Sequence, residues 1–360
     1  MPRGDRALLR SHVGAGNPNW TLGVDGIVFE TTTDTVRNDF GPEVAQPALL
    51  ALPQRNPLGQ GRVMGKDEPV LRLVLPKGSL EKATLDLFAS ADLAVTRSSA
   101  IDYRASIDDP RIDTVRILRP QEIAGYVAEG LFDLGITGRD WIEETASDVI
   151  SVGELHYSKV SDRPVRVVVA VAQDSPFQSA EELPHGTRVS SEYPELTRRF
   201  FEKRGIDADI RLSYGATEAK VPDIVDCIVD MTETGGALRA AGLKIIDTIL
   251  VSYTELIANP VSYAVPAKAH AMHQIRTLLE GTMEARGKVL VKLNVSAADL
   301  DAVIELLPSM KAPTVSQLFG DAGYAVEAVV PKGEINVLIP ALKDHGASDI
   351  IEVPLSKIVH

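Results

Sequence analysis

Short apolar runs and amphipathic stretches alternate along most of the chain, with glycine-containing turns between them. The clearest apolar runs are "LRLVL" at 71–75 and "VRVVVAVA" at 165–172, and the second is almost continuously β-branched. Such runs are typical of strands in a sheet that is covered on both faces. The stretches "GSLEKATLDLFASAD" at 78–92 and "PELTRRFFEKRG" at 194–205 predict helices between the strands. This alternation predicts an α/β fold with mostly parallel sheets.

The last part of the chain has an order of elements of its own. Strand and helix patterns follow one another as "GKVLVKLNV", "SAADLDAVIELLP", "PTVSQLF", "YAVEAVV", "KGEINVLIPALKDHG" and "ASDIIEVPL". The order βαββαβ is that of a ferredoxin-like domain. Such domains serve as small-molecule sensors or as oligomerisation modules, and the order alone does not choose between these roles.

We predict two lobes followed by this ferredoxin-like domain. The chain would begin the first lobe, cross over to build the second, and then return to the first. The expected boundaries are 69–162 with 245–284 for lobe 1, 163–244 for lobe 2, and 286–360 for the ferredoxin-like domain. No internal repeat is obvious in the sequence.

Residues 1–66 show no sustained hydrophobic period. They lack the basic start and continuous apolar core of a secretory signal, and they carry acidic residues that transit peptides avoid. Met64 lies just before the first periodic segment. We expect this segment to be a disordered arm or an extension upstream of the native start; the alternative is a small cap that packs on the body.

A protein that begins at Met64 is therefore expected to fold and to keep full activity, because no periodic core pattern precedes that residue. The measurement is the activity and circular dichroism of the shortened chain beside those of the full chain. A shortened protein that no longer folds would show that the first residues pack on the body.

Composition and charge narrow the possible functions. The 360 residues carry a net charge of −13, and the pI is near 5.1, which argues against a broad nucleic-acid surface. The single cysteine, Cys227, excludes an intramolecular disulfide and a cysteine-based metal site. No apolar run approaches the length of a membrane span. We expect a cytoplasmic protein that binds neither nucleic acid nor membrane.

The segment "DMTETGGALRAAG" at 230–242 has the features of an anion-binding loop. An apolar strand ends at Asp230, Thr234 supplies a hydroxyl, and two glycines precede a helix expected to begin near Ala237. Glycines allow close approach of a ligand, and the first amides of a helix point at it, so the segment predicts a cradle for a phosphate monoester. It is neither a Walker loop nor a dinucleotide fingerprint, and the alternative is a tight strand-to-helix turn.

Cationic residues follow three other predicted strands. Lys77, with Gly78 and Ser79, lies in "LPKGSL", Arg119 in "ILRPQE" and Arg139 in "GITGRDW". Ligands of open α/β sheets bind at the carboxyl ends of the strands. A single cation there is usually a solvated surface charge. Several cations beside a glycine loop favour a polyanionic substrate in a cleft between the two lobes.

These segments together resemble the ATP phosphoribosyltransferase family in its long form, the first enzyme of histidine biosynthesis. The resemblance covers the chain from about residue 71 to its end. It is carried by "LRLVLPKGSL", "FDLGITGRDW", "GATEAKVPDIVDCIVDMTETGGALRAAGL", "EGTMEARGKV" and "APTVSQL…VVPKGEINVLIPALKDHGASDIIEVPLSKIV". The family signature maps to Glu218, Asp230 and the segment 234–238. The spacer between the two acids is one residue short, and Ala237 stands where the family often has threonine, so we expect weaker phosphate binding.

The resemblance implies a two-lobed catalytic unit like a periplasmic binding protein, with the ferredoxin-like domain as a regulatory module. It also implies transfer of phosphoribosyl from phosphoribosyl pyrophosphate to N1 of ATP, with Mg²⁺ as the cofactor and pyrophosphate as the leaving group. Ring nitrogen N1 has a lone pair and no proton to lose, so no general base is required. Catalysis should rest on positioning and on stabilisation of the departing charge.

The resemblance also implies roles for individual residues. The 5-phosphate of the ribose would lie on Thr234, Gly235, Gly236 and Ala237, with Glu218, Asp230, Glu233 and Leu238 as the other residues of the phosphoribosyl pyrophosphate site. Asp230 and Glu233 are candidates for ribose hydroxyls or Mg²⁺, although Glu233 equally well only caps the turn. The remaining phosphates and ATP would meet Lys77, Gly78, Ser79, Arg119, Arg139, Ser190, Ser191 and Tyr193.

The C-terminal domain resembles one that binds histidine as a feedback inhibitor. Thr314 matches a hydroxyl position of the family, and Asn294 stands where some relatives carry an acid. An amide offers no charge pairing to the ligand, so we expect weak inhibition; the alternative is a domain that only builds the oligomer. The family expectation is a homo-oligomer, from dimer to hexamer.

Two other functions remain open at this point. A two-lobed solute-binding or anion-binding protein would share the fold and the cradle, but it should carry a signal peptide and lack the C-terminal domain. A different phosphoribosyltransferase would carry an acidic pair followed by a threonine-rich phosphate loop, which this chain matches only in part.

Overall fold

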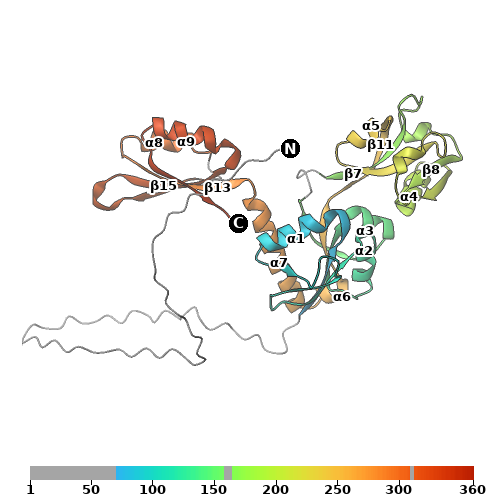
Figure 1. Cartoon of the computed structure of the whole chain (residues 1–360), viewed down its shortest axis with the longest axis horizontal. Helices are drawn as coiled ribbons and strands as arrows, with labels where there is room; N and C mark the ends of the chain where they lie inside the picture. Colours follow the sequence, from blue (N-terminus) through green and yellow to red (C-terminus); the bar gives the residue numbers. More distant parts are fainter. Residues whose placement is uncertain (1–69, 158–163, 309–311) are drawn as a thin grey trace, which may run out of the picture. The chain divides into compact units, whose positions relative to one another are not determined.

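The computed structural model describes residues 70–157, 164–308 and 312–360. Within these residues the strands form three separate sheets, each with its own helices (Figure 1). The predicted N-terminal extension lies outside the described residues. No helix in the described part of the chain combines the length and the apolar character needed to cross a bilayer.

The first sheet has the strand order β2-β3-β4-β1-β5-β12-β6. Its strands are β1 (Leu71–Pro76), β2 (Val95–Thr96), β3 (Arg104–Ile107), β4 (Ile112–Leu118), β5 (Leu134–Gly138), β6 (Ile150–Leu155) and β12 (Thr254–Ala258). The helical segments of this lobe are η1 (Gly78–Leu80), α1 (Glu81–Ser90), α2 (Pro120–Ala128), α3 (Arg139–Thr145), α6 (Pro260–Tyr263) and α7 (Pro266–Ala285).

The second sheet has the order β11-β7-β10-β8-β9. Its strands are β7 (Val165–Ala172), β8 (Thr187–Ser191), β9 (Ala208–Leu212), β10 (Cys227–Thr232) and β11 (Leu243–Ser252). Its helical segments are η2 (Ala180–Glu182), α4 (Pro194–Glu202), η3 (Thr217–Lys220) and α5 (Gly236–Ala240).

The two sheets repeat one topology that the sequence does not reveal. In each, three parallel strands stand in the order second, first, third: β4-β1-β5 and β9-β8-β10. Next to the third of these strands lies an antiparallel strand, which is β12 in the first sheet and β7 in the second. In each lobe this is the first strand that the chain forms after it crosses from the other lobe. The sheets are therefore mixed, where the sequence predicts mostly parallel ones.

The return of the chain to the first lobe comes later than predicted. Strand β11 pairs with β7 along its whole length to Ser252, so it belongs to the second sheet. We therefore propose a lobe boundary after Ser252 in place of residue 245.

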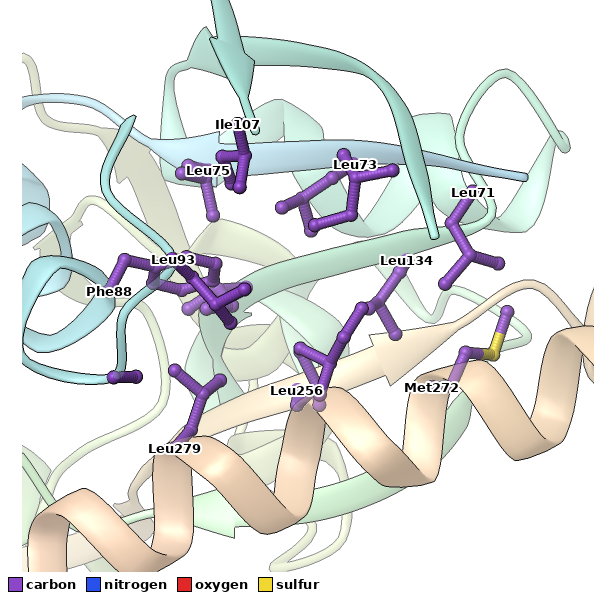
Figure 2. Packing of buried hydrophobic residues seen from close by; sticks show 14 of the residues in the cluster. Leu71, Leu73, Leu75, Phe88, Leu93, Ile107, Leu134, Leu256, Met272 and Leu279 are labelled. Carbon is purple, nitrogen blue, oxygen red and sulfur yellow. The ribbon is translucent and has the colours of Figure 1, made fainter. Parts of the chain in front are cut away.

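The first lobe has a core between its sheet and α7 (Figure 2). Leu73, Leu134 and Leu256 come from the neighbouring strands β1, β5 and β12, and they face Met272 and Leu279 of the helix. All five side chains are fully buried. Each buried leucine contributes about 1.5–3 kcal/mol, so this core holds the strand ends that carry the predicted binding loops.

The C-terminal domain has the predicted βαββαβ order and the sheet order β14-β15-β13-β16, which is that of the ferredoxin-like fold. Its elements are β13 (Lys288–Val295), α8 (Leu300–Leu306), β14 (Thr314–Gln317), η4 (Phe319–Asp321), β15 (Tyr324–Pro331), η5 (Lys332–Glu334), α9 (Ile335–Asp344) and β16 (Ser348–Pro354). Alternate residues of β13 are buried, so one face of the sheet packs in the core and the other carries polar side chains.

Candidate functional site

The β10–α5 loop has the backbone that its sequence predicts. Gly235 has a φ of +74°, in the left-handed region that favours glycine, and its N–H donates to Thr232 Oγ1 at 2.9 Å. Helix α5 begins at Gly236, one residue before the expected Ala237. The amides of Ala237 and Leu238 lie in the first turn, where no carbonyl of the helix can accept them. These two donors are available to an anion.

The two glycines of this loop have different roles. A Cβ on Gly235 would lie 2.9 Å from Arg239 Nη1 and 3.2 Å from Ile245 Cδ1. That position points toward the protein, so Gly235 is needed for the turn and for packing. Gly236 is exposed, and its Cβ would meet only Thr234 Oγ1, at 3.4 Å. Thr234 and Ala237 are also exposed. The outer surface of the loop is therefore formed by Thr234, Gly236 and Ala237.

The acidic residues of the signature lie together at the end of β10. Asp230 is half-buried, and its Oδ1 accepts a hydrogen bond from the N–H of Met231 at 2.7 Å. Burial raises the pKa of Asp230 above its ordinary value, and the nearby carboxylates of Glu192 and Glu218 raise it further. Glu218 is half-buried in η3, and in the described part of the chain no group hydrogen-bonds its carboxylate. These acids can accept hydrogen bonds from sugar hydroxyls.

A cavity of about 270 Å³ lies beside the loop. Ser79 and Glu233 are the predicted residues among its lining. Its other walls are mainly apolar and aromatic, with Leu80, Trp141, Leu155, Tyr157, Met231 and Tyr253 among them. The sequence does not indicate these residues, because the spacing of apolar and aromatic residues along helices, strands and loops does not separate a ligand contact from ordinary packing.

The cationic side chains at the strand ends differ in whether a carboxylate of the protein already pairs with them. Lys77 is half-buried after β1, with its Nζ 4.1 Å from the centre of the Tyr103 ring. Arg119 is exposed at the N-terminus of α2. Arg139 is bound by carboxylates, with Nη2 2.7 Å from Glu143 Oε1 and Nη1 3.5 Å from Glu255 Oε1. A phosphate would have to compete with these carboxylates for Arg139, so Lys77 and Arg119 are the more available cations.

The turn after β1 is open to a ligand. Gly78 has a φ of +82°, and a Cβ there would meet no atom within 4 Å. Both Gly78 and Ser79 are exposed. The turn is therefore set by backbone conformation, and Ser79 is among the residues that line the cavity.

Ser190, Ser191 and Tyr193 are buried, and each hydroxyl already has a partner. Ser191 Oγ accepts from the N–H of Tyr193 at 2.8 Å, and Tyr193 Oη donates to Asp140 Oδ2 at 2.9 Å. The Tyr193 ring also packs on Trp141, with 4.6 Å between the ring centres. Burial and the Asp140 carboxylate raise the pKa of Tyr193 well above its ordinary value. The contacts of Tyr193 with Asp140 and Trp141 thus connect the start of α4 with α3.

The proposed regulatory residues lie on the polar face of the C-terminal sheet. Asn294 pairs with Ala325 of β15, and Thr314 on β14 pairs with Glu327 two residues further along that strand. Paired residues share a face, so the two side chains lie on one side of the sheet, two strands apart. Asn294 Nδ2 donates to Asp349 Oδ2 at 2.9 Å. Asp349 thus places a carboxylate where the sequence indicated only an amide.

Comparisons with known proteins show which family the chain belongs to. A family model described as "ATP phosphoribosyltransferase" matches residues 119–281, and one described as "HisG, C-terminal domain" matches residues 285–357. The ATP phosphoribosyltransferase of Pelotomaculum thermopropionicum is 45% identical over 289 residues, which are 80% of this chain and 99% of the relative. That of Chlorobaculum parvum is 43% identical over 296 residues, 82% of this chain and 100% of the relative.

A solved structure shares the fold. The ATP phosphoribosyl transferase (HisG:HisZ) complex from Thermotoga maritima contains a chain that superposes with a TM-score of 0.51 at 25% identity. The match covers 59% of this chain and 99% of that chain. The structural class is thus a two-lobed α/β protein extended by a ferredoxin-like domain. The chain belongs to the ATP phosphoribosyltransferase family, in its long form.

Proposed function

We propose that the protein transfers phosphoribosyl from phosphoribosyl pyrophosphate to N1 of ATP, releasing pyrophosphate, as the first step of histidine biosynthesis. The observation that carries this function is the match to the family over four-fifths of the chain. The assay is incubation with both substrates and Mg²⁺, followed by detection of the phosphoribosyl-ATP adduct and pyrophosphate. Absence of both products would refute the function.

The reaction requires little acid–base chemistry from the protein. N1 of adenine attacks the anomeric carbon with its lone pair, and the bond to pyrophosphate breaks as positive character develops on the sugar. The protein must align these two atoms and stabilise the charge that leaves.

Phosphoribosyl pyrophosphate is proposed to lie over the β10–α5 loop. The amides of Ala237 and Leu238 and the hydroxyl of Thr234 would hold its 5-phosphate. Glu218 and Asp230 would accept hydrogen bonds from the ribose hydroxyls. The exposed positions of Thr234, Gly236 and Ala237 support this placement. Glu233, which lines the cavity, is proposed to face the same substrate.

ATP is proposed to place its adenine in the neighbouring cavity. The apolar walls formed by Trp141 and Tyr253 suit a planar ring. Lys77, Ser79 and Arg119 would receive the phosphates. Arg139, Ser190, Ser191 and Tyr193 are already engaged within the protein, so we propose that they support the site and do not carry most of the binding.

Magnesium fits this site only through the substrates. Among the described residues no group of three or more His, Cys, Asp or Glu side chains could hold a metal ion. When bound with the phosphates, magnesium would neutralise the leaving pyrophosphate.

The C-terminal domain is proposed to bind histidine as a feedback inhibitor, on the face that carries Asn294 and Thr314. The Asp349 carboxylate beside Asn294 supports this proposal, because an amino-acid ammonium requires an anion.

We also propose that the protein forms a homo-oligomer, from dimer to hexamer, in the cytoplasm. Gel filtration with light scattering would measure the subunit number.

Histidine is expected to inhibit without competing with either substrate, because its proposed pocket lies in a separate domain. Thr314→Ala should raise the half-inhibitory histidine concentration about 10-fold, within the range of ordinary couplings of about 1–3 kcal/mol. Asp349→Asn should weaken inhibition at least as much, because it removes the carboxylate. Uninhibited rates should stay near wild type.

The measurement is the initial rate against histidine concentration for each protein. Asn294→Asp should tighten inhibition, since a second carboxylate would pair with the ligand ammonium. The domain would be identified as an assembly module if histidine in the millimolar range does not inhibit the wild-type protein and Asn294→Asp does not become sensitive to it.

A further inference from the structure

Lys220 occupies a position at the substrate loops that the signature does not predict. It ends η3, between the two acids Glu218 and Asp230, in the spacer that is one residue shorter than usual. Its Nζ donates to Ser213 Oγ at 2.6 Å and to Ser190 Oγ at 3.1 Å. The side chain is half-buried, so its ammonium is directed into the lobe.

The two serines connect Lys220 to the strands that carry the site. Ser190 lies in β8 and is paired with Ile228 of β10, two residues before Asp230. Ser213 follows β9, and its N–H donates to Ser191 O at 2.7 Å. Ser213 Oγ also lies 2.7 Å from Thr217 Oγ1 at the start of η3. One ammonium therefore joins the ends of β8 and β9 to η3, beside the end of β10.

Acidic side chains lie at the end of β10, beside the hydrogen-bonded serines. Glu192 of the β8–α4 turn and Glu218 of η3 both act electrostatically on Asp230 of β10, and Asp230 acts on the buried hydroxyl of Tyr193. Lys220 acts in the opposite direction, lowering the pKa of Asp230 while burial and the other acids raise it. Lys220 therefore places a positive charge beside this acidic strand end.

We propose that Lys220 is a positioning residue for phosphoribosyl pyrophosphate, which orders the serine-bearing strand ends and offsets the acidic edge on which the ribose lies. This inference rests on the proposed placement of that substrate over the β10–α5 loop. Two of the three N–H donors of the ammonium are used by Ser190 and Ser213, so Lys220 acts mainly through these residues and Asp230.

The test compares Lys220→Met and Lys220→Arg with wild type, using steady-state kinetics with each substrate varied in turn. In Lys220→Met, KM for phosphoribosyl pyrophosphate should rise about 10-fold, the effect of losing a charge-assisted hydrogen bond. In the same variant, KM for ATP should change less than about twofold, because no hydrogen bond to ATP is lost. Lys220→Arg should recover most of the loss, because it keeps the charge and the donors.

The split between KM and kcat separates positioning from a purely structural role. Loss of positioning in Lys220→Met should raise KM for phosphoribosyl pyrophosphate while kcat stays within about twofold of wild type, whereas a general loss of structure would change kcat and both KM values. Lys244→Met is the matched control, because Lys244 is half-buried in the same lobe and donates to the Ser175 carbonyl at 2.7 Å. Its KM and kcat values should equal those of wild type.

The proposal is overturned if Lys220→Met keeps the wild-type KM for phosphoribosyl pyrophosphate, or if Lys244→Met reproduces its changes. If Lys220→Met does not fold, Ser213→Ala decides the question. That variant keeps the charge and removes one acceptor of the ammonium, so KM for phosphoribosyl pyrophosphate should rise; an unchanged KM refutes the proposal. A wild-type protein that forms no adduct refutes the enzymatic function itself, which is a separate outcome.

Discussion

Gly235→Val is expected to lower kcat/KM for phosphoribosyl pyrophosphate about 100-fold, mainly through KM. A left-handed backbone costs an ordinary residue about 1–2 kcal/mol, and a β-branched residue more. The new Cβ would also lie 3.2 Å from Ile245 Cδ1, which is a close contact, whereas the exposed Arg239 guanidinium at 2.9 Å can move aside. The backbone of the loop must therefore shift, and the amides of Ala237 and Leu238 move with it. Steady-state kinetics with each substrate varied in turn measures the effect.

Gly205→Val is the matched control. Gly205 has a φ of +69° and follows α4, but a Cβ there meets no atom within 4 Å. It should therefore lower thermal stability through backbone strain and leave KM for phosphoribosyl pyrophosphate unchanged. If both variants raise KM for phosphoribosyl pyrophosphate equally, backbone strain acts on the whole protein and not on the loop. If Gly235→Val keeps the wild-type KM, the loop does not bind this substrate.

Asp230→Asn is expected to lower kcat/KM for phosphoribosyl pyrophosphate about 100-fold at neutral pH, because an amide replaces the ionised acceptor of the ribose hydroxyls. Burial and the neighbouring acids Glu192 and Glu218 raise the pKa of Asp230, while Lys220 lowers it. The required form is the carboxylate, so wild-type kcat/KM should fall as pH falls through this raised pKa. The Asn variant should lack that acid limb.

The same substitution should make the fold more stable at neutral pH. A carboxyl group whose pKa is raised in the folded state stabilises the fold fully only below its unfolded pKa, and that contribution is lost as pH rises through the folded pKa. At neutral pH the buried charge of Asp230 is therefore unfavourable, and Asn removes it. Thermal denaturation at several pH values measures the difference, which should shrink toward acid pH. Wild-type kinetics in Asp230→Asn would exclude Asp230 from the site.

Some of the site could be predicted from the sequence because it depends on local backbone. Gly235 and Gly78 both adopt positive φ at strand-to-helix turns, and residue type alone indicates such positions. The acids of the signature are brought to one strand end by the short path from η3 to β10. The apolar walls of the cavity could not be predicted, because Trp141 and Tyr253 come from segments more than 100 residues apart in the chain.

The sequence by itself determined the alternation of strands and helices, the ferredoxin-like order of the last domain and the glycine turn that leads into α5. These features follow from hydrophobic period and from residues with special backbone freedom, which act over a few neighbours. Only the tertiary structure decided which polar groups remain available to a ligand. Arg139 pairs with Glu143, and Tyr193 donates to Asp140. Asp349 and Lys220 gain their proposed roles from hydrogen bonds to Asn294 and Ser190, which are distant in the chain. Hydrogen bonds and charges act between groups that are close in space, and that closeness is created by the sheets.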